Sequence, residues 1–247
     1  MRELTRDKIF GGEITLLQHK KGYRFGTDAL LLATDLPTLE AGDVVIELGA
    51  AHGAVAITIA ASRKDVHVIA VERQEALADL LEQNIRENEL ENIEAVRGDL
   101  RDYREVLTGH SANLVVFNPP YFRPGERRLS SCEERAAAHH ELHGTLEDFI
   151  LAACYALKPG GYLKMIAPPM RMPDVFEAMS STDFNLGSMR FFHTTGAREA
   201  YLVEYVLRRG GTPDFKVLAP LFLYEDDERD YTSEAARRLG SAARLEG

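Results

Sequence analysis

The sequence has little cysteine and no long apolar run. Of its 247 residues only Cys132 and Cys154 are cysteines, and this pair suits neither a disulfide framework nor a zinc site. No stretch reaches the roughly 18 apolar residues of a membrane span, and the charged start MRELTRDKIF lacks the apolar segment of a secretory signal. These absences predict a cytoplasmic protein with no membrane partner and two free thiols.

Basic residues are also too few to balance the acidic ones. The chain has 29 Lys and Arg against 39 Asp and Glu, a net charge of −10. Spread evenly, this charge would repel nucleic acid. Basic side chains nevertheless outnumber acidic ones in residues 1–34, and four arginines cluster further on, at Arg123, Arg127, Arg128 and Arg135. The charge therefore weighs against a nucleic-acid partner without excluding one.

The composition is that of a folded domain. With 45% hydrophobic and 28% charged residues, the chain is neither disordered nor fibrous. It contains no repeat of 20 to 50 residues and no low-complexity tract. A chain of this length can bury one sizeable core, so we expect one domain.

Strand and helix patterns alternate along the chain. Short apolar, β-branched runs predict strands at 43–48, 66–71, 93–96, 114–117 and 161–167, with helices between them at 53–62, 75–88 and 145–157. Runs that are apolar on both faces and separated by helices are typical of a parallel sheet covered on both sides. Two further runs, 184–193 and 199–207, flank a short turn and predict a closing antiparallel hairpin. We therefore predict an α/β fold with a mainly parallel seven-stranded sheet.

The flanking segments complete this organisation. Residues 1–42 are interpreted as an extension of the same domain, with a small hairpin around Lys20-Lys21-Gly22 and a helix over 27–34. Residues 43–210 form the core, and residues 211–247 are interpreted as a C-terminal tail. Asp28 is either a helix N-terminal carboxylate or a residue of the binding site.

Polar groups and glycines follow three of the predicted strands. Gly49 and Gly53, after Glu47, permit a tight turn and close backbone approach to a ligand. Glu72 ends the second strand, where a carboxylate can accept hydrogen bonds from both ribose hydroxyls. Asp99 follows the third strand. In a parallel sheet these carboxyl ends meet in one crevice, although the glycine segment taken alone could be a plain strand-to-helix turn.

The most specific pattern is Asn118-Pro119-Pro120-Tyr121, directly after the fourth predicted strand. The two prolines fix φ and remove two donors, which holds carbonyl groups rigidly outward. Hydrogen bonds from a planar amine to the Asn118 side-chain oxygen and the Pro119 carbonyl would aim its lone pair at an electrophile. Tyr121 would stack on a flat substrate.

With these residues the chain resembles the class I S-adenosylmethionine-dependent methyltransferases, in particular the bacterial tRNA adenine methyltransferases that modify a valine tRNA beside its anticodon. The likeness covers most of the chain and includes the Phe25 to Leu32 segment, the Glu47 to Gly53 turn, Asn118 to Arg123, Ala138 to Glu141, Leu157 to Gly161, and Asp230-Tyr231-Thr232. It implies a Rossmann-like fold, with S-adenosylmethionine as cofactor and RNA, in particular tRNA, as partner.

The resemblance also implies roles for single residues. Glu47, Gly49 and Gly53 would line the methionine part of the cofactor, Glu72 its ribose and Asp99 its adenine, with Asn118 beside them. Asn118, Pro119 and Tyr121 would hold the target amine. The chain departs from the family pattern at Ala51, where the middle glycine is usual, and the added methyl group bears on cofactor affinity. His139, His140 and Glu141 lack the spacing of a metal site.

These features predict methylation of the exocyclic amine of an adenine in structured RNA, in particular an anticodon-loop adenine of tRNA. One alternative is methylation of a glutamine amide in a translation release factor, which uses the same planar-amine chemistry. A second is a noncatalytic RNA-binding or scaffold protein in which Ala51 has abolished cofactor binding. The sequence indicates no oligomeric state.

Overall fold

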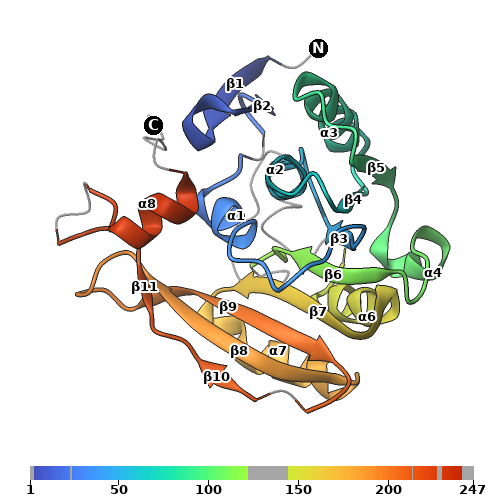
Figure 1. Cartoon of the computed structure of the whole chain (residues 1–247), viewed down its shortest axis with the longest axis vertical. Coiled ribbons are helices and arrows are strands. Elements are labelled where there is room, and N and C mark those ends of the chain that lie inside the picture. The colour runs from blue at the N-terminus through green and yellow to red at the C-terminus, as the bar shows by residue number, and fades with distance from the viewer. Residues whose placement is uncertain (1–2, 23, 122–143, 213, 227–229, 241–247) are drawn as a thin grey trace.

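The apolar, β-branched runs form the central sheet of the computed structural model, which describes residues 3–22, 24–121, 144–212, 214–226 and 230–240. The seven main strands (Figure 1) are β3 (Val44–Leu48), β4 (His67–Glu72), β5 (Ile93–Arg97), β6 (Ala112–Phe117), β7 (Leu157–Ala167), β8 (Phe184–His193) and β9 (Ala200–Arg209). Their order across the sheet is β8-β9-β7-β6-β3-β4-β5. Strands β3 to β7 are parallel, whereas β9 runs antiparallel to β7 and β8. The predicted α/β sheet with its antiparallel C-terminal hairpin is confirmed.

Two short strands extend this sheet beyond the prediction. Strands β10 (Lys216–Val217) and β11 (Leu221–Phe222) both pair in parallel with β8, which brings the sheet to nine strands. The hairpin of β8 and β9 is therefore not the outermost part of the sheet. Runs of two residues are too short to show a strand period in the sequence.

Helices cover both faces of the sheet (Figure 1). One face carries α1 (Thr27–Leu32), α2 (Ala54–Ser62) and α3 (Glu75–Glu87), and the other carries α4 (Tyr103–Val106), α6 (Leu146–Ala156) and α7 (Met172–Ser180). Two 3-10 turns, η2 (Leu100–Asp102) and η3 (Pro169–Arg171), precede α4 and α7. In the described ranges no helix is both long enough and apolar enough to cross a membrane.

Each central strand contributes to two cores, because successive side chains of a strand point to opposite faces. Along β3, Val45 belongs to the cluster under α1 and α2, whereas Ile46 belongs to the cluster under α6 and α7. Along β6, Val116 and Phe117 divide in the same way. All four side chains are at most 1% exposed. This two-sided burial explains why the strands appear in the sequence as continuous apolar runs.

The N-terminal hairpin is present, but its turn is not the predicted one. Strands β1 (Leu4–Ile9) and β2 (Ile14–His19) pair antiparallel, and the chain reverses through the 3-10 turn η1 (Phe10–Gly12). All three residues of η1 have positive φ, a conformation that two glycines make accessible. Lys20-Lys21-Gly22 forms a second turn after β2, closed by a hydrogen bond from Gly22 N to His19 O. The hairpin expected around Lys20-Lys21-Gly22 therefore lies nearer the N-terminus, and these three residues follow its second strand.

The segment predicted only as a C-terminal tail contains ordered elements. Besides β10 and β11 it carries α8 (Ser233–Leu239), which packs against α1. The Thr232 side chain caps α8 by accepting a hydrogen bond from Ala235 N. Arg238 is 2% exposed and donates to Leu31 O at 2.9 Å and to Glu204 Oε2 at 3.1 Å. Helix α8, in the C-terminal segment, thus covers one side of α1.

Candidate functional site

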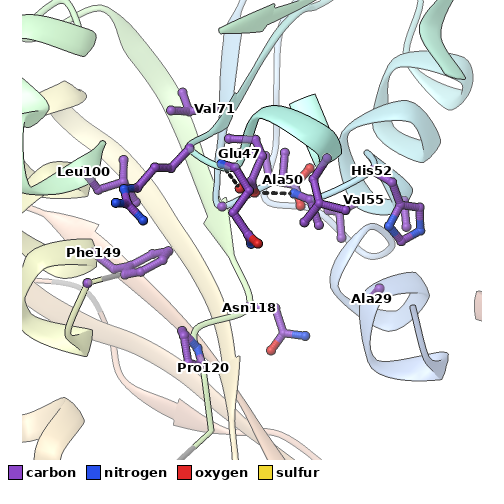
Figure 2. Close-up of a pocket in the computed structure, with 18 of the residues that line it drawn as sticks. Ala29, Glu47, Ala50, His52, Val55, Val71, Leu100, Asn118, Pro120 and Phe149 are labelled. Atoms are coloured by element: carbon purple, nitrogen blue, oxygen red, sulfur yellow. Dashed lines mark hydrogen bonds between the residues drawn. The ribbon is translucent and has the colours of Figure 1, made fainter. Parts of the chain in front are cut away.

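A pocket lies where the parallel strands β3, β4, β5 and β6 end (Figure 2). The carboxyl ends of parallel strands share one edge of a sheet, so the segments that follow them converge there. From these segments the pocket receives, among others, Glu47, Gly49, Ala51, Glu72, Gly98 and Asn118. Of the site residues predicted from the sequence, Glu47, Gly49, Glu72 and Asn118 lie on this lining. Gly53, Asp99, Pro119 and Tyr121 lie close in the chain but outside it.

The turn between β3 and α2 requires its two glycines. Gly49 has a φ of 73°, and a Cβ there would lie 3.2 Å from the Phe149 ring. Gly53, the N-cap of α2, has a φ of 96°, and a Cβ there would lie 2.5 Å from Leu81 Cδ1. Ala51, between them, also has a positive φ, of 49°. The middle position therefore has the left-handed conformation that favours glycine although it carries a methyl group.

Glu47 places a buried carboxyl group at the end of β3. Glu47 is only 4% exposed. Its Oε2 accepts a hydrogen bond from Ala56 N, in the first turn of α2, at 2.8 Å. Burial, with a smaller contribution from the negative charge of Glu72, raises the pKa of Glu47 to about 8, although the hydrogen bond from Ala56 N opposes this shift. A cationic group in the pocket would favour the ionised form of this carboxyl group.

Glu72 is held by the backbone at the end of β4. Its Oε2 accepts from Ala51 N at 2.8 Å and its Oε1 from Gln74 N at 2.7 Å. Burial raises the pKa of Glu72, while these backbone hydrogen bonds oppose the shift. Each carboxylate oxygen can still accept a further hydrogen bond from a ligand hydroxyl.

Asp99 is bound by two arginines beside the pocket. Arg101 donates to it from Nε at 3.0 Å and from Nη2 at 2.6 Å, and Arg73 Nε lies 2.7 Å from its Oδ2. The hydrogen bonds from Arg101 hold the pKa of Asp99 well below its usual range. Its neighbours Gly98 and Leu100 line the pocket, but Asp99 itself does not.

The Asn118 to Tyr121 segment presents one unsatisfied acceptor. Asn118 and Pro120 line the pocket, opposite the turn that carries Ala50 (Figure 2), whereas Pro119 is buried beside it. Asn118 Nδ2 donates to Asp28 Oδ2 at 3.1 Å, and the Tyr121 hydroxyl donates to the same oxygen at 2.6 Å. Among the described residues, the buried Asn118 Oδ1 has no hydrogen-bond partner.

Apolar walls of the pocket were not singled out in the sequence. Phe149 and Leu100 lie on one side of the pocket and Val55 and His52 on another (Figure 2). Burial lowers the pKa of His52 to about 4, so its ring is neutral near pH 7. Phe149 belongs to the ordinary apolar stripe of α6, and no local signal distinguishes it from a core residue. These walls suit a flat, largely apolar ligand group next to the two carboxylates.

Other predicted residues do not enter this site. In the described ranges no group of three or more His, Cys, Asp or Glu residues is arranged to hold a metal ion. Cys154 is a free, half-buried thiol. Phe122, Cys132, the four clustered arginines, His139, His140 and Glu141 lie outside the residues that the structure describes.

Comparison with known proteins identifies a family and several relatives. The family model for the methyltransferase small domain matches residues 23–182. Among curated relatives, the release factor glutamine methyltransferase of Shewanella oneidensis is 30% identical over 137 residues, which are 53% of this chain and 46% of the relative. The tRNA1(Val) (adenine(37)-N6)-methyltransferase of Aliivibrio fischeri is 26% identical over 176 residues, 70% of this chain and 72% of the relative.

Solved structures share the fold. A predicted O-methyltransferase from Agrobacterium tumefaciens superposes with a TM-score of 0.70 at 21% identity, covering 87% of this chain and 95% of that chain. TYW2 of M. jannaschii in complex with AdoMet superposes with a TM-score of 0.57 at 16% identity, covering 85% and 88%. The chain spans 53% or less of the length of three of the curated relatives it matches.

Proposed function

The chain belongs to the methyltransferase small domain family, and we propose that it methylates the exocyclic amine of an adenine in structured RNA, in particular an anticodon-loop adenine of tRNA. The methyl donor is S-adenosylmethionine. One observation carries the choice of acceptor: the buried Asn118 Oδ1 has no hydrogen-bond partner among the described residues. An oxygen of this kind is satisfied by a ligand that donates, such as an amine.

The residues of the pocket fit S-adenosylmethionine. The buried carboxyl group of Glu47 suits the cationic methionine part, and the backbone-oriented carboxylate of Glu72 suits the ribose hydroxyls. The apolar walls at Leu100 and Phe149 suit the adenine ring. When bound, the cofactor supplies an electrophilic methyl group on a sulfonium.

Asp99 has a smaller part in this proposal than the resemblance implies. Its carboxylate is already bound by Arg101 and Arg73. Oδ1 already accepts from Arg101 N and Nε, and Oδ2 from Arg101 Nη2 and Arg73 Nε. A hydrogen bond from the adenine amine would have to use a remaining lone pair of one of these oxygens. We therefore assign the adenine chiefly to the apolar walls and to the backbone of Gly98 to Leu100.

The protein's contribution to the reaction is mainly alignment. Asn118 Oδ1 and the Pro119 carbonyl accept hydrogen bonds from the target amine and direct its lone pair towards the pocket. No strong general base is needed, because the attacked amine becomes acidic and can lose its proton through these acceptors to water. Tyr121 ends this segment and is partly buried against the core. We assign its partly exposed ring the stacking contact with the flat substrate.

Relatives support RNA as the substrate and also keep an alternative open. The Aliivibrio fischeri relative, named for adenine 37 of tRNA1(Val), aligns with 70% of this chain. The Shewanella oneidensis relative is more identical but aligns with only 53% of this chain. It acts on a release factor glutamine, as its name states, and a glutamine amide is also a planar amine. Methylation of such an amide is the second candidate.

The experiment that tests the proposal uses methyl-labelled S-adenosylmethionine. We expect label on adenine when unmodified total tRNA is the acceptor, and none with the Asn118→Ala variant. Label on release factor protein, also lost in Asn118→Ala, would replace the proposal with the glutamine alternative. Absence of label on both acceptors, together with no binding of the cofactor at millimolar concentration, would contradict enzymatic activity.

A further inference from the structure

Asp28 connects helix α1 to the Asn118 to Tyr121 segment, which carries the proposed acceptor of the target amine, Asn118 Oδ1. It is an acidic residue in the first turn of α1. Its Oδ2 accepts hydrogen bonds from Asn118 Nδ2 at 3.1 Å and from the Tyr121 hydroxyl at 2.6 Å, across 90 and 93 positions of sequence. Its Oδ1 lies 3.0 Å from Ala29 N, which orients the carboxylate. One side chain thus holds two residues of the substrate-facing segment.

The contact with Asp28 fixes which end of the Asn118 amide faces the pocket. A carboxylate accepts but cannot donate, so it selects the Nδ2 end of an amide and excludes the Oδ1 end. With Nδ2 bound to Asp28, Oδ1 is left as the group available to a substrate. The pocket therefore offers an acceptor at this point and favours a substrate group that donates.

Helix α1 gives Asp28 a rigid base. Leu30, Leu31 and Leu32 are fully buried, and Arg238 of α8 donates to the Leu31 carbonyl at 2.9 Å. A hydrogen-bonding group on a packed helix is positioned more accurately than one on a loop. The position of Asp28 is thus set by the core and not by the substrate.

We propose that Asp28 is a positioning residue that locks the Asn118 amide with its oxygen towards the substrate and holds Tyr121 beside it. Through this lock the site selects a planar amine and disfavours a carbonyl group at the same point. The part that concerns substrate choice rests on the proposed function. The part that concerns the Asn118 amide rests on the geometry alone.

The kinetic test compares Asp28→Ala with Asp28→Asn. Loss of charge-assisted hydrogen bonds predicts that Asp28→Ala lowers kcat about 10- to 100-fold, with the Kd of S-adenosylmethionine within about twofold of the original. Asp28→Asn keeps one acceptor oxygen, so its kcat should lie between that of the original protein and that of Asp28→Ala. A matched control is Glu234→Ala, which also removes an acidic first-turn residue, from α8, and its hydrogen bond with Arg190.

Three results would overturn the proposal. The first is an unchanged kcat in Asp28→Ala. The second is a loss of kcat matched by an equal loss of cofactor binding or of thermal stability, which would indicate a structural role. The third is an equal loss of activity in Glu234→Ala.

A second measurement does not depend on activity. In protein labelled with ¹⁵N-asparagine, the Asn118 side-chain amide signal is identified by its absence in Asn118→Ala. We expect its protons to exchange slowly with water in the original protein and faster in Asp28→Ala. Equal exchange in both would contradict the lock. If the original protein methylates neither RNA nor release factor, the proposed function fails, while this signal still decides the role of Asp28.

Discussion

Ala51 carries backbone strain at the centre of the turn between β3 and α2. Its φ of 49° lies in the left-handed region, which costs an L-residue about 1–2 kcal/mol. The backbone N–H of Ala51 also donates a hydrogen bond to Glu72 Oε2 at 2.8 Å. The conformation is therefore imposed by the turn between β3 and α2, whose two glycines have positive φ as well.

We predict that Ala51→Gly stabilises the protein slightly. Glycine removes the left-handed strain but costs about 0.5–1 kcal/mol of unfolded-state entropy. The net gain of up to about 1.5 kcal/mol corresponds to a rise in Tm of up to about 3–6 °C for a chain of this size. Thermal melts measure it. Ala50→Gly is the control, because Ala50 has no positive φ and this variant should lose stability. Equal losses of stability in both variants would contradict backbone strain at Ala51.

Glu47 should make stability depend on pH. Its pKa is raised to about 8 in the folded protein, so folding favours the protonated form. This contribution is fully present below the unfolded pKa, near 4.5, and is lost as pH rises through about 8. Between pH 6 and pH 9 we expect Tm to fall more in the original protein than in Glu47→Gln. The exposed Glu82→Gln is the control, and equal falls in all three would refute the prediction.

At the scale of elements, two helices support the Asn118 to Tyr121 segment from different sides. Asp28 of α1 binds two of its side chains. Arg171, in η3 before α7, directs Nη1 to the Pro120 and Tyr121 carbonyls, both at 3.4 Å, and pairs with Asp174. The segment after β6 is thus held through side chains on one side and through its backbone on the other.

Helix α8 should be necessary for the packing of α1. Arg238 is buried against Glu204, Leu31 and Thr34. Removing one member of a buried ion pair costs about 3–5 kcal/mol, and we expect the lower end here because Glu204 keeps its ion pair with the buried Lys164, at 3.0 Å. We expect Arg238→Met to lower Tm by about 6–12 °C or more. Arg237→Met, next to it on the exposed face of α8, should change stability by no more than about 0.5 kcal/mol. Similar melts for the two variants would show that the buried network contributes little.

At the scale of the whole molecule, the pocket that we propose for the cofactor joins four strand ends that are far apart in sequence. A ligand that binds only the folded chain stabilises it by mass action, by about 2.7 kcal/mol at 100 times its Kd. We predict that S-adenosylhomocysteine at that excess raises Tm by about 5–10 °C, and that Glu72→Gln reduces the rise. No shift at millimolar ligand would contradict the assignment of the pocket.

The sequence by itself determined the sheet and the location of the pocket. Apolar runs alternating with helical patterns specify parallel strands covered on both faces, because burial of both faces leaves a continuous apolar run. Parallel strands end at one edge, so the sequence assigns Glu47, Glu72 and Asp99 to one crevice. Glu47 and Glu72 line the pocket, as does Asn118, which the resemblance placed beside them, whereas Asp99 lies outside the lining. Gly49 was assigned with them and also lies on the pocket.

Only the tertiary structure decided which groups those residues contact. Asp28 reaches Asn118 across 90 positions, Arg101 and Arg73 bind Asp99, and η1 rather than Lys20-Lys21-Gly22 reverses the hairpin. Local periodicity reports which face of an element is buried, whereas a side chain's partner depends on how distant elements pack. For the same reason the sequence did not predict the packing of α8. An arginine is usually exposed, and only the tertiary structure shows that Arg238 is buried beside Glu204.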